Sequence, residues 1–153
     1  MSDPLSDLAD KDAIVDLLVR LFIGTDNRDW AAVESCFAPT VHFDMSSVGA
    51  GPAVDRSPRQ IIAAWEEGLR PLEAVHHQAG NHRVTIEGDR ATAFCYGVAF
   101  HYRRTHSGRN TRTFVGSYDF GLQRSTSVWR IDSFRFNLKF LDGNLELEKE
   151  PAA

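Results

Sequence analysis

The spacing of apolar residues changes about halfway along the chain. Before Pro71, apolar residues recur every three or four positions, as on the buried face of a helix. This period predicts helices over residues 10–24, 30–36 and 58–69. After Pro71, apolar and polar residues alternate, which is the period of a strand that is buried on one face.

Residues at the ends of these segments support the predicted helices. Gly24 is expected to end the first helix, and Asp29 to cap the second. Pro39 prevents the second helix from continuing, because the residue before a proline avoids the helical region. The run Ser57-Pro58-Arg59-Gln60 has the form of a capping box with proline at the first helical position.

The second half predicts long strands joined by short turns, which form an antiparallel meander. The predicted strands cover residues 41–45, 76–86, 90–105, 110–123 and 128–141, with turns at 87–89 and 106–108. Residues 46–56 are expected to form a loop that covers a site. We therefore predict an α+β fold in which a curved antiparallel sheet wraps around three helices into a half-open cone, a cystatin-like α+β barrel. One domain is expected over residues 1–153, with 1–9 flexible or loosely docked and 145–153 as a tail.

Composition and charge narrow the class of partner. The chain has 153 residues, of which 42% are hydrophobic, and its formal net charge is −4. This charge gives no basic surface for nucleic acid or anionic membrane, so a small-molecule partner is expected. The sequence contains neither a signal-peptide pattern nor an apolar run of ~18 residues, and a cytoplasmic location is predicted. Cys36 and Cys95 are expected to be free and buried.

Residues 90–104 have one bulky face and one small face. Even positions carry Phe94, Tyr96, Val98, Phe100 and Tyr102, whereas odd positions carry small residues and end at His101. The small face could line a ligand site that His101 orients. Alternatively, the aromatic residues could fill the interior and the small face could contact a second subunit. The pattern favours neither arrangement.

The histidines favour proton transfer over metal binding. On a strand, His76 and His77 point to opposite faces, and His76 and His82 would lie about 20 Å apart. No metal site is therefore predicted. A single histidine beside a carboxylate is an effective general base at neutral pH. Two carboxylates, Asp26 and Asp29, follow the first predicted helix. Asp29 is already expected to cap the second helix, so Asp26 is the one available to pair with a histidine. Motifs for covalent catalysis or nucleotide cofactors are not found in the sequence.

Several of these segments resemble a known family. Thr25-Asp26-Asn27-Arg28-Asp29-Trp30, the run 36–45, His77-Gln-Ala-Gly-Asn81, Phe100-His101-Tyr102-Arg103 and Val115-Gly116-Ser117-Tyr118 resemble scytalone dehydratase and the SnoaL-like members of the nuclear transport factor 2 superfamily. The resemblance covers nearly the whole chain. It implies a cone with a pocket at one end, a catalytic pair on Asp26 and His77, and a second pocket histidine on His101. A similar pair occurs in hexachlorocyclohexane dehydrochlorinases and bile-acid dehydratases, which remove a proton from carbon without a metal or organic cofactor.

The sequence also departs from these relatives. Thr25 and Met45 occupy the positions of two water-holding tyrosines of scytalone dehydratase, and Ser117 and Asp119 those of a substrate-binding serine and asparagine. With Trp65 of the third predicted helix, these four residues are the expected substrate contacts. Phe134 stands where the dehydrochlorinases have an arginine, and Arg135 is expected to point away. This difference argues against dehydrohalogenation as the reaction.

These observations predict a cofactor-independent acid–base enzyme, a dehydratase, isomerase or cyclase, that acts on an apolar, ring-bearing small molecule. Asp26 would orient His77, His77 would take the proton, and His101 would position or protonate the departing or enolic oxygen. The alternative is a non-catalytic module of the same fold that binds a hydrophobic ligand or another protein. A separation of ~2.6–3.2 Å between Asp26 and His77 inside a cavity would favour the enzyme.

A homo-oligomer, dimer or trimer, is also expected, through an aromatic sheet face that includes Phe134, Phe136 and Phe140.

Overall fold

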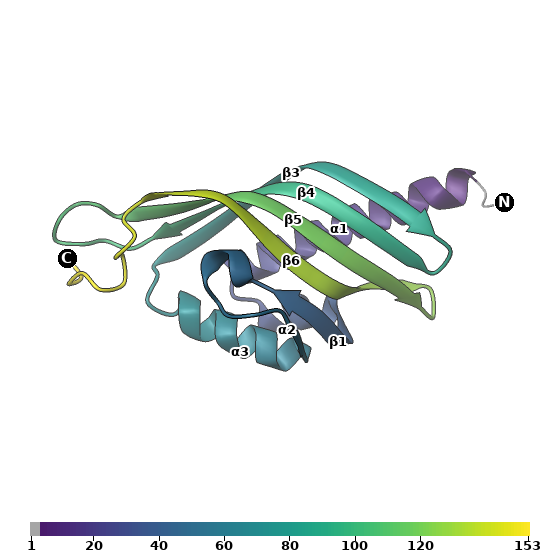
Figure 1. The fold of residues 1–153 in the computed structure, drawn as a ribbon, viewed down its shortest axis with the longest axis horizontal. Coiled ribbons are helices and arrows are strands. Elements are labelled where there is room, and N and C mark those ends of the chain that lie inside the picture. Colours follow the sequence, from purple (N-terminus) through teal and green to yellow (C-terminus); the bar gives the residue numbers. More distant parts are fainter. Residues whose placement is uncertain (1–3) are drawn as a thin grey trace.

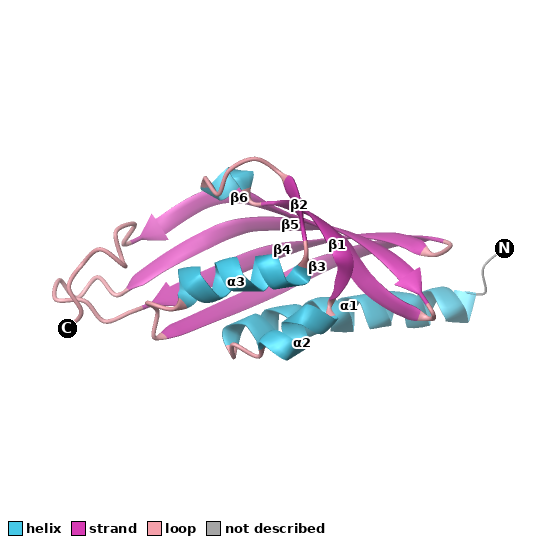
Figure 2. Ribbon diagram, turned by 90° about the horizontal axis from the view of Figure 1, so that it is seen from below, coloured by secondary structure: helices cyan, strands magenta, loops and turns pink. Residues whose placement is uncertain are grey.

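The computed structural model describes residues 4–153, in which one curved sheet of six strands is covered on one face by helices (Figure 1). The elements are α1 (Pro4–Asp26), α2 (Trp30–Ser35), β1 (Phe37–Asp44), the 3₁₀ turn η1 (Ser46–Val48), β2 (Val54–Arg56), α3 (Pro58–Leu69), β3 (Ala74–Glu87), β4 (Arg90–Tyr102), β5 (Thr111–Ser125) and β6 (Val128–Gly143). Seen from below, the helices lie across the concave side of the sheet (Figure 2). The predicted α+β cone is confirmed. Within the described residues, no helix is long and apolar enough to cross a membrane.

The ends of α2 and α3 follow their capping residues. Asp29 accepts a hydrogen bond from the Ala32 backbone N–H at 3.1 Å. At α3, the Ser57 hydroxyl accepts from the Gln60 N–H at 3.3 Å, and the Gln60 side chain accepts from the Ser57 N–H at 2.9 Å. The capping box therefore sets the start of α3 at Pro58, as the sequence predicts.

The predicted limits of the first helix are wrong at both ends. Helix α1 begins at Pro4, so residues 4–9 are helical; residues 1–3 of the predicted flexible N-terminus lie outside the described residues. Gly24 does not end the helix, which continues to Asp26. A side chain at Gly24 would approach Val33 Cγ2 to 3.1 Å, so this glycine allows α2 to pack closely on α1.

The sheet is mixed rather than purely antiparallel. Strands β3 to β6 form the predicted meander, but β1 runs parallel to β6, with Phe43 opposite Phe134. Strand β1 also starts earlier than expected and contains Pro39, near which the register with β6 shifts. Strand β2 pairs with β1 inside the predicted loop 46–56. These pairings join distant segments, so a local period could not reveal them.

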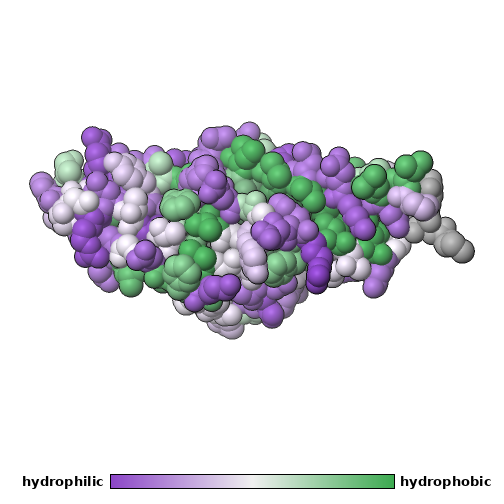
Figure 3. All heavy atoms as spheres, turned by 90° about the horizontal axis from the view of Figure 1, so that it is seen from above, coloured by the Kyte–Doolittle hydropathy of each residue, from purple (hydrophilic) through white to green (hydrophobic). Residues whose placement is uncertain are grey.

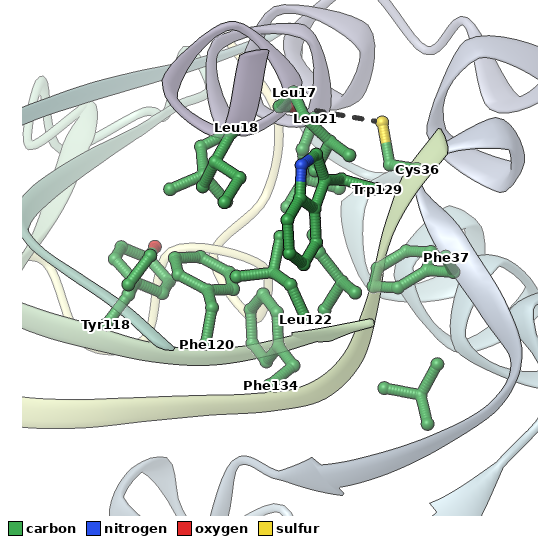
Figure 4. Packing of buried hydrophobic residues seen from close by; sticks show 14 of the residues in the cluster. Leu17, Leu18, Leu21, Cys36, Phe37, Tyr118, Phe120, Leu122, Trp129 and Phe134 are labelled. Atoms are coloured by element: carbon green, nitrogen blue, oxygen red, sulfur yellow. Dashed lines mark hydrogen bonds between the residues drawn. The ribbon is translucent and has the colours of Figure 1, made fainter. Parts of the chain in front are cut away.

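The core lies between α1 and the concave face of the sheet. In Figure 4, Leu17, Leu18 and Leu21 of α1 lie on one side of the cluster, and Tyr118 and Phe120 of β5 on the other. The small face of β4 belongs to this interior: Cys95 is fully buried, whereas Tyr96 on the opposite face is 48% exposed. Of the two arrangements that the sequence left open, the structure therefore has the one with the small face inward.

The predicted aromatic contact face is wrong for two of its three residues. Phe134 and Phe136 are buried in the core, and only Phe140 is exposed on the outer face. Phe134 and Phe136 lie opposite Phe120 and Tyr118, which point inward from β5, and are buried with them. Beyond them the β5–β6 register shifts, so that Gly116 faces Leu138 but Val115 faces Phe140. The extra residue reverses which side chains point inward. The outer side of the sheet carries a mixture of hydrophobic and hydrophilic residues (Figure 3).

The C-terminal segment, residues 144–153, packs against the end of the sheet. Leu147 is fully buried against Leu72 and Val75. Arg103 of the loop after β4 donates hydrogen bonds to the Leu147 and Glu150 carbonyls at 3.0 and 2.9 Å. The predicted tail is thus docked on the same end of the sheet as His101.

Candidate active site

Asp26 and His77 form a close pair between α1 and β3. The His77 Nδ1 atom lies 2.6 Å from Asp26 Oδ1, and the His77 backbone N–H donates to Asp26 Oδ2 at 2.8 Å. Each side chain is 15% exposed. Because a carboxylate accepts hydrogen bonds, the Nδ1 atom carries the proton, so the lone pair of the neutral His77 ring is at Nε2.

Strand alternation and the length of α1 bring this pair together. His76 points to the outer face, where its ring lies 6.3 Å from that of Phe100, so His77 points inward. The two additional residues of α1 beyond Gly24 carry Asp26 to the sheet. Phe22, one turn earlier on α1, stacks on the His77 ring with centroids 5.5 Å apart. The pair is therefore fixed by a hydrogen-bonded carboxylate and by an aromatic contact.

The pair borders a largely apolar cavity with two lobes. One lobe, of about 150 Å³, is lined by Leu21, Phe22, Thr25, Met45, Trp65, Leu69, His77, His101, Tyr118 and Phe134. The other, of about 140 Å³, is lined by Met45, Val48, His77, Ala99, His101, Phe114, Tyr118 and Phe136. The predicted residues Thr25, Met45 and Trp65 therefore lie in the cavity wall. The Thr25 hydroxyl donates a hydrogen bond to the Leu21 carbonyl of the same helix, α1, at 2.8 Å.

His101 lies near the C-terminal end of β4 and lines both lobes. Its Nδ1 atom lies 3.0 Å from Nη2 of Arg112, which faces it in the β4–β5 ladder. Burial, the nearby Arg112 guanidinium and His77 lower the pKa of His101 to about 4. His101 is therefore neutral at pH 7.

Ser117 and Asp119 are not in the cavity, so the structure does not support their predicted role as substrate contacts. They lie on the outer face of β5, where Asn137 donates to Ser117 Oγ at 3.3 Å and to Asp119 Oδ2 at 2.7 Å. The even positions of β5 face the helices, so the residue between them, Tyr118, points inward.

Tyr118 is the polar residue of the cavity wall that the sequence did not predict as part of the site. It lines both lobes, and burial raises the pKa of its hydroxyl. The alternation of β5 could have identified it, since its even positions 114, 118, 120 and 122 are all apolar or aromatic. Gly97 of β4 makes room for the ring, because a Cβ atom there would lie 2.2 Å from Tyr118 Cε2.

Other reactive groups do not add to this site. Phe134 lines the cavity, whereas Arg135 points away and pairs with Asp44 at 3.0 Å, as the alternation predicts. Cys95 is free and buried, and burial raises the pKa of its thiol to about 12. Among residues 4–153, no group of three His, Cys, Asp or Glu side chains is placed to hold a metal ion.

The fold agrees with the match to a family model. Residues 6–135 match the SnoaL-like domain, and the chain belongs to this family. No curated protein sequence matches the chain.

Solved structures share the fold. The Kfla4162 protein of Kribbella flavida is 24% identical, with a TM-score of 0.87 over 94% of this chain and 99% of that one. Hexachlorocyclohexane dehydrochlorinase LinA-type3 from Novosphingobium barchaimii is 17% identical, with a TM-score of 0.79 over 94% and 95%. A Novosphingobium aromaticivorans protein named after scytalone dehydratase is 12% identical, with a TM-score of 0.77 over 96% and 93%. At these identities the likeness concerns the fold.

Proposed function

We propose that this protein is an acid–base enzyme of the dehydratase, isomerase or cyclase kind that acts on an apolar, ring-bearing small molecule without a metal or organic cofactor. The observation that carries the proposal is the 2.6 Å contact between Asp26 and His77 Nδ1 at the wall of an apolar cavity. The distance is that of a hydrogen bond. The exposed His42–Asp55 pair has a similar distance, 2.9 Å, so the position of the Asp26–His77 pair in a cavity wall is the distinguishing feature. It therefore favours an enzyme over a module that only binds a ligand.

His77 would act as the general base. Asp26 holds the proton on Nδ1, so the Nε2 lone pair is the one available to a substrate C–H. When Nε2 takes the proton, the ring becomes an imidazolium, and the adjacent carboxylate stabilises its positive charge. The backbone N–H of His77 bound to the same carboxylate keeps the geometry fixed during this step.

The two lobes fit a small ring system. A cavity of about 150 Å³ with apolar walls holds one benzene-sized ring. Met45, His77, His101 and Tyr118 line both lobes, so a substrate with one or two fused rings would place its reactive carbon near the two histidines. His77, His101 and Tyr118 carry the polar groups among these four residues, and these groups are expected to act on the substrate.

Hydrogen–deuterium exchange at carbon tests the proposal before the natural substrate is known. Ring ketones and hydroxy ketones would be incubated with the protein in D₂O, and the loss of acidic C–H signals followed by NMR. We expect His77→Gln to slow the exchange about 10²–10⁴-fold, which is the usual contribution of a general base. His76→Gln, the neighbouring histidine on the outer face, is the matched control and is expected to exchange at the wild-type rate. Equal rates in wild type and His77→Gln, on a compound that the protein does turn over, would disprove the role of His77.

A homo-oligomer is part of this proposal. Tyr96 is 48% exposed and Phe140 is 52% exposed, and both lie on the outer face of the sheet. Two or three copies of the chain would bury these rings against one another.

A further inference from the structure

A chain of three charged or polar side chains runs from the C-terminal segment to the cavity. Arg112 of β5 donates from Nη1 to Glu148 Oε2 at 2.8 Å, and from Nη2 to both Glu148 Oε1 and His101 Nδ1, the latter at 3.0 Å. The Arg112 side chain is 15% exposed and the Glu148 side chain 28%. The Arg112 guanidinium also lies over the Phe114 ring, 5.3 Å from its centroid. Contacts with Glu148 and Phe114 thus hold the Arg112 guanidinium in place beside His101.

The chemistry of arginine fixes the proton of His101. A guanidinium remains protonated in proteins and has no acceptor atom, so its contact with Nδ1 requires a lone pair there. A neutral imidazole then carries its proton on Nε2. The ionisable groups that face His101 are Arg112 of β5, His77 of β3, Asp26 of α1 and Glu148 of the C-terminal segment. Arg112 and His77 oppose a positive charge on His101, and the two carboxylates favour it.

We propose that Arg112 is a positioning residue which, anchored by Glu148, keeps His101 as a neutral Nε2–H donor, so that the cavity takes ring compounds with a carbonyl oxygen next to the reacting C–H. The choice of substrate class rests on the proposed function, whereas the role of Arg112 does not. His101 then binds oxygen and transfers no proton. Of its two expected roles, positioning and protonating the oxygen, this selects the first.

The resulting step balances without a further reagent. Nε2 of His77 takes the proton from the carbon beside the carbonyl, and the C–H electron pair forms the C=C bond of an enolate. The negative charge moves to the oxygen, where the His101 N–H donates a hydrogen bond. His77 then returns the same proton. In an isomerisation, the enolate re-forms the carbonyl as a different carbon of the conjugated system takes the proton. In a dehydration, the enolate re-forms the carbonyl, its C=C electron pair forms the new C=C bond, the C–O bond breaks, and the departing hydroxyl takes the proton to leave as water.

Histidine NMR on the ¹⁵N-labelled protein tests the role of Arg112 without any substrate. In wild type, we expect His101 to be neutral and protonated on Nε2 from about pH 5 to about pH 8. Arg112→Met is expected to mix the tautomers and to raise the titration midpoint of His101 by about one pH unit or more. Arg104→Met is the matched control, because Arg104 forms a similar pair with Glu73 near the same end of the sheet. A wild-type His101 that is cationic at pH 7 or protonated on Nδ1 would overturn the proposal, even if Arg112→Met failed to fold.

Ligand binding tests the substrate class separately from catalysis. In the His77→Gln background, where turnover is blocked, α-tetralone and its hydrocarbon counterpart tetralin serve as probes. We expect the ketone to bind about 5-fold more tightly or better, and this preference to be lost when Arg112→Met is added but kept with Arg104→Met. Equal binding of the two probes would refute the carbonyl preference. A clear ketone preference without any exchange at carbon in wild type would instead refute the proposed function and leave the role of Arg112 intact.

Discussion

Replacing Gly97 by alanine is expected to destabilise the protein by displacing a cavity residue. The added Cβ atom would lie 2.2 Å from Cε2, 2.8 Å from Cδ2 and 3.3 Å from Cζ of Tyr118. Ordinary contact distances between carbon atoms are ~3.5–4.0 Å, so the ring must move by more than about 1 Å. The backbone of Gly97 has no positive φ, and the strain therefore comes from this contact alone.

The neighbours of Tyr118 leave the ring little room to move. Its centroid lies 4.9 Å from that of Phe22, 4.8 Å from Phe136 and 5.8 Å from Phe120. Overpacking in such a core costs about 1–3 kcal/mol. Alanine also restricts the unfolded chain more than glycine does, which stabilises the folded protein by about 0.4–1 kcal/mol. We therefore expect a net loss of roughly 1–2 kcal/mol in the free energy of unfolding, or about 2–8 °C in the melting temperature.

Thermal and urea unfolding, followed by circular dichroism, measure this loss. The control is Gly80→Ala on the neighbouring strand β3, where an added Cβ meets no atom within 4 Å. This variant is expected to be as stable as wild type or slightly more stable. Combining Gly97→Ala with Tyr118→Leu removes the ring, and the coupling between the two sites should recover about 1 kcal/mol. If Gly97→Ala were as stable as Gly80→Ala, the packing of Tyr118 on Gly97 would be wrong.

Two further predictions concern the far end of α1 and the outer face of the sheet. Asp10 accepts hydrogen bonds from the Trp129 indole at 3.0 Å and from Arg124 at 2.7 Å, and these, the indole first, lower its pKa from the usual 3.8. In urea unfolding at pH 7, Asp10→Asn is therefore expected to lower the free energy of unfolding by about 1 kcal/mol. This difference between the variant and wild type should shrink as the pH falls through the lowered pKa of Asp10, because protonated Asp10 loses the same interaction. A difference that grew in acid would contradict this account. Light scattering at micromolar concentration is expected to show a dimer or trimer, which Phe140→Lys weakens, and a monomeric wild type would remove this use of the outer face.

The elements that the sequence predicts well are those with local causes. The capping box at Ser57 fixes the start of α3, and the alternation after Pro71 gives four long strands to within a few residues. The same alternation separates His76 from His77 and Phe134 from Arg135. Each of these features depends on residues within a few positions of one another, and their spacing is visible in the chain itself.

The candidate site could be predicted in part. Asp26 stood out because Asp29 had a capping role, the alternation over residues 90–104 indicated His101, and the family resemblance supplied His77. The predicted substrate contacts at Ser117 and Asp119 are wrong, because the alternation of β5 places Tyr118 inward and both of these side chains outward. Arg112 and Glu148 could not be predicted, since their contact joins a strand to a segment 36 residues further along the chain.

The sequence by itself determined the presence of three helices and four long strands and, within each regular stretch of strand, which side chains share a face. Only the tertiary structure decided which of the two faces α1 covers, that β1 lies parallel to β6, and that α1 continues far enough to bring Asp26 to His77. The physical reason is that backbone hydrogen bonding and periodic burial are local preferences. The choice between faces depends on the total area that two layers bury together, and no single segment contains that information.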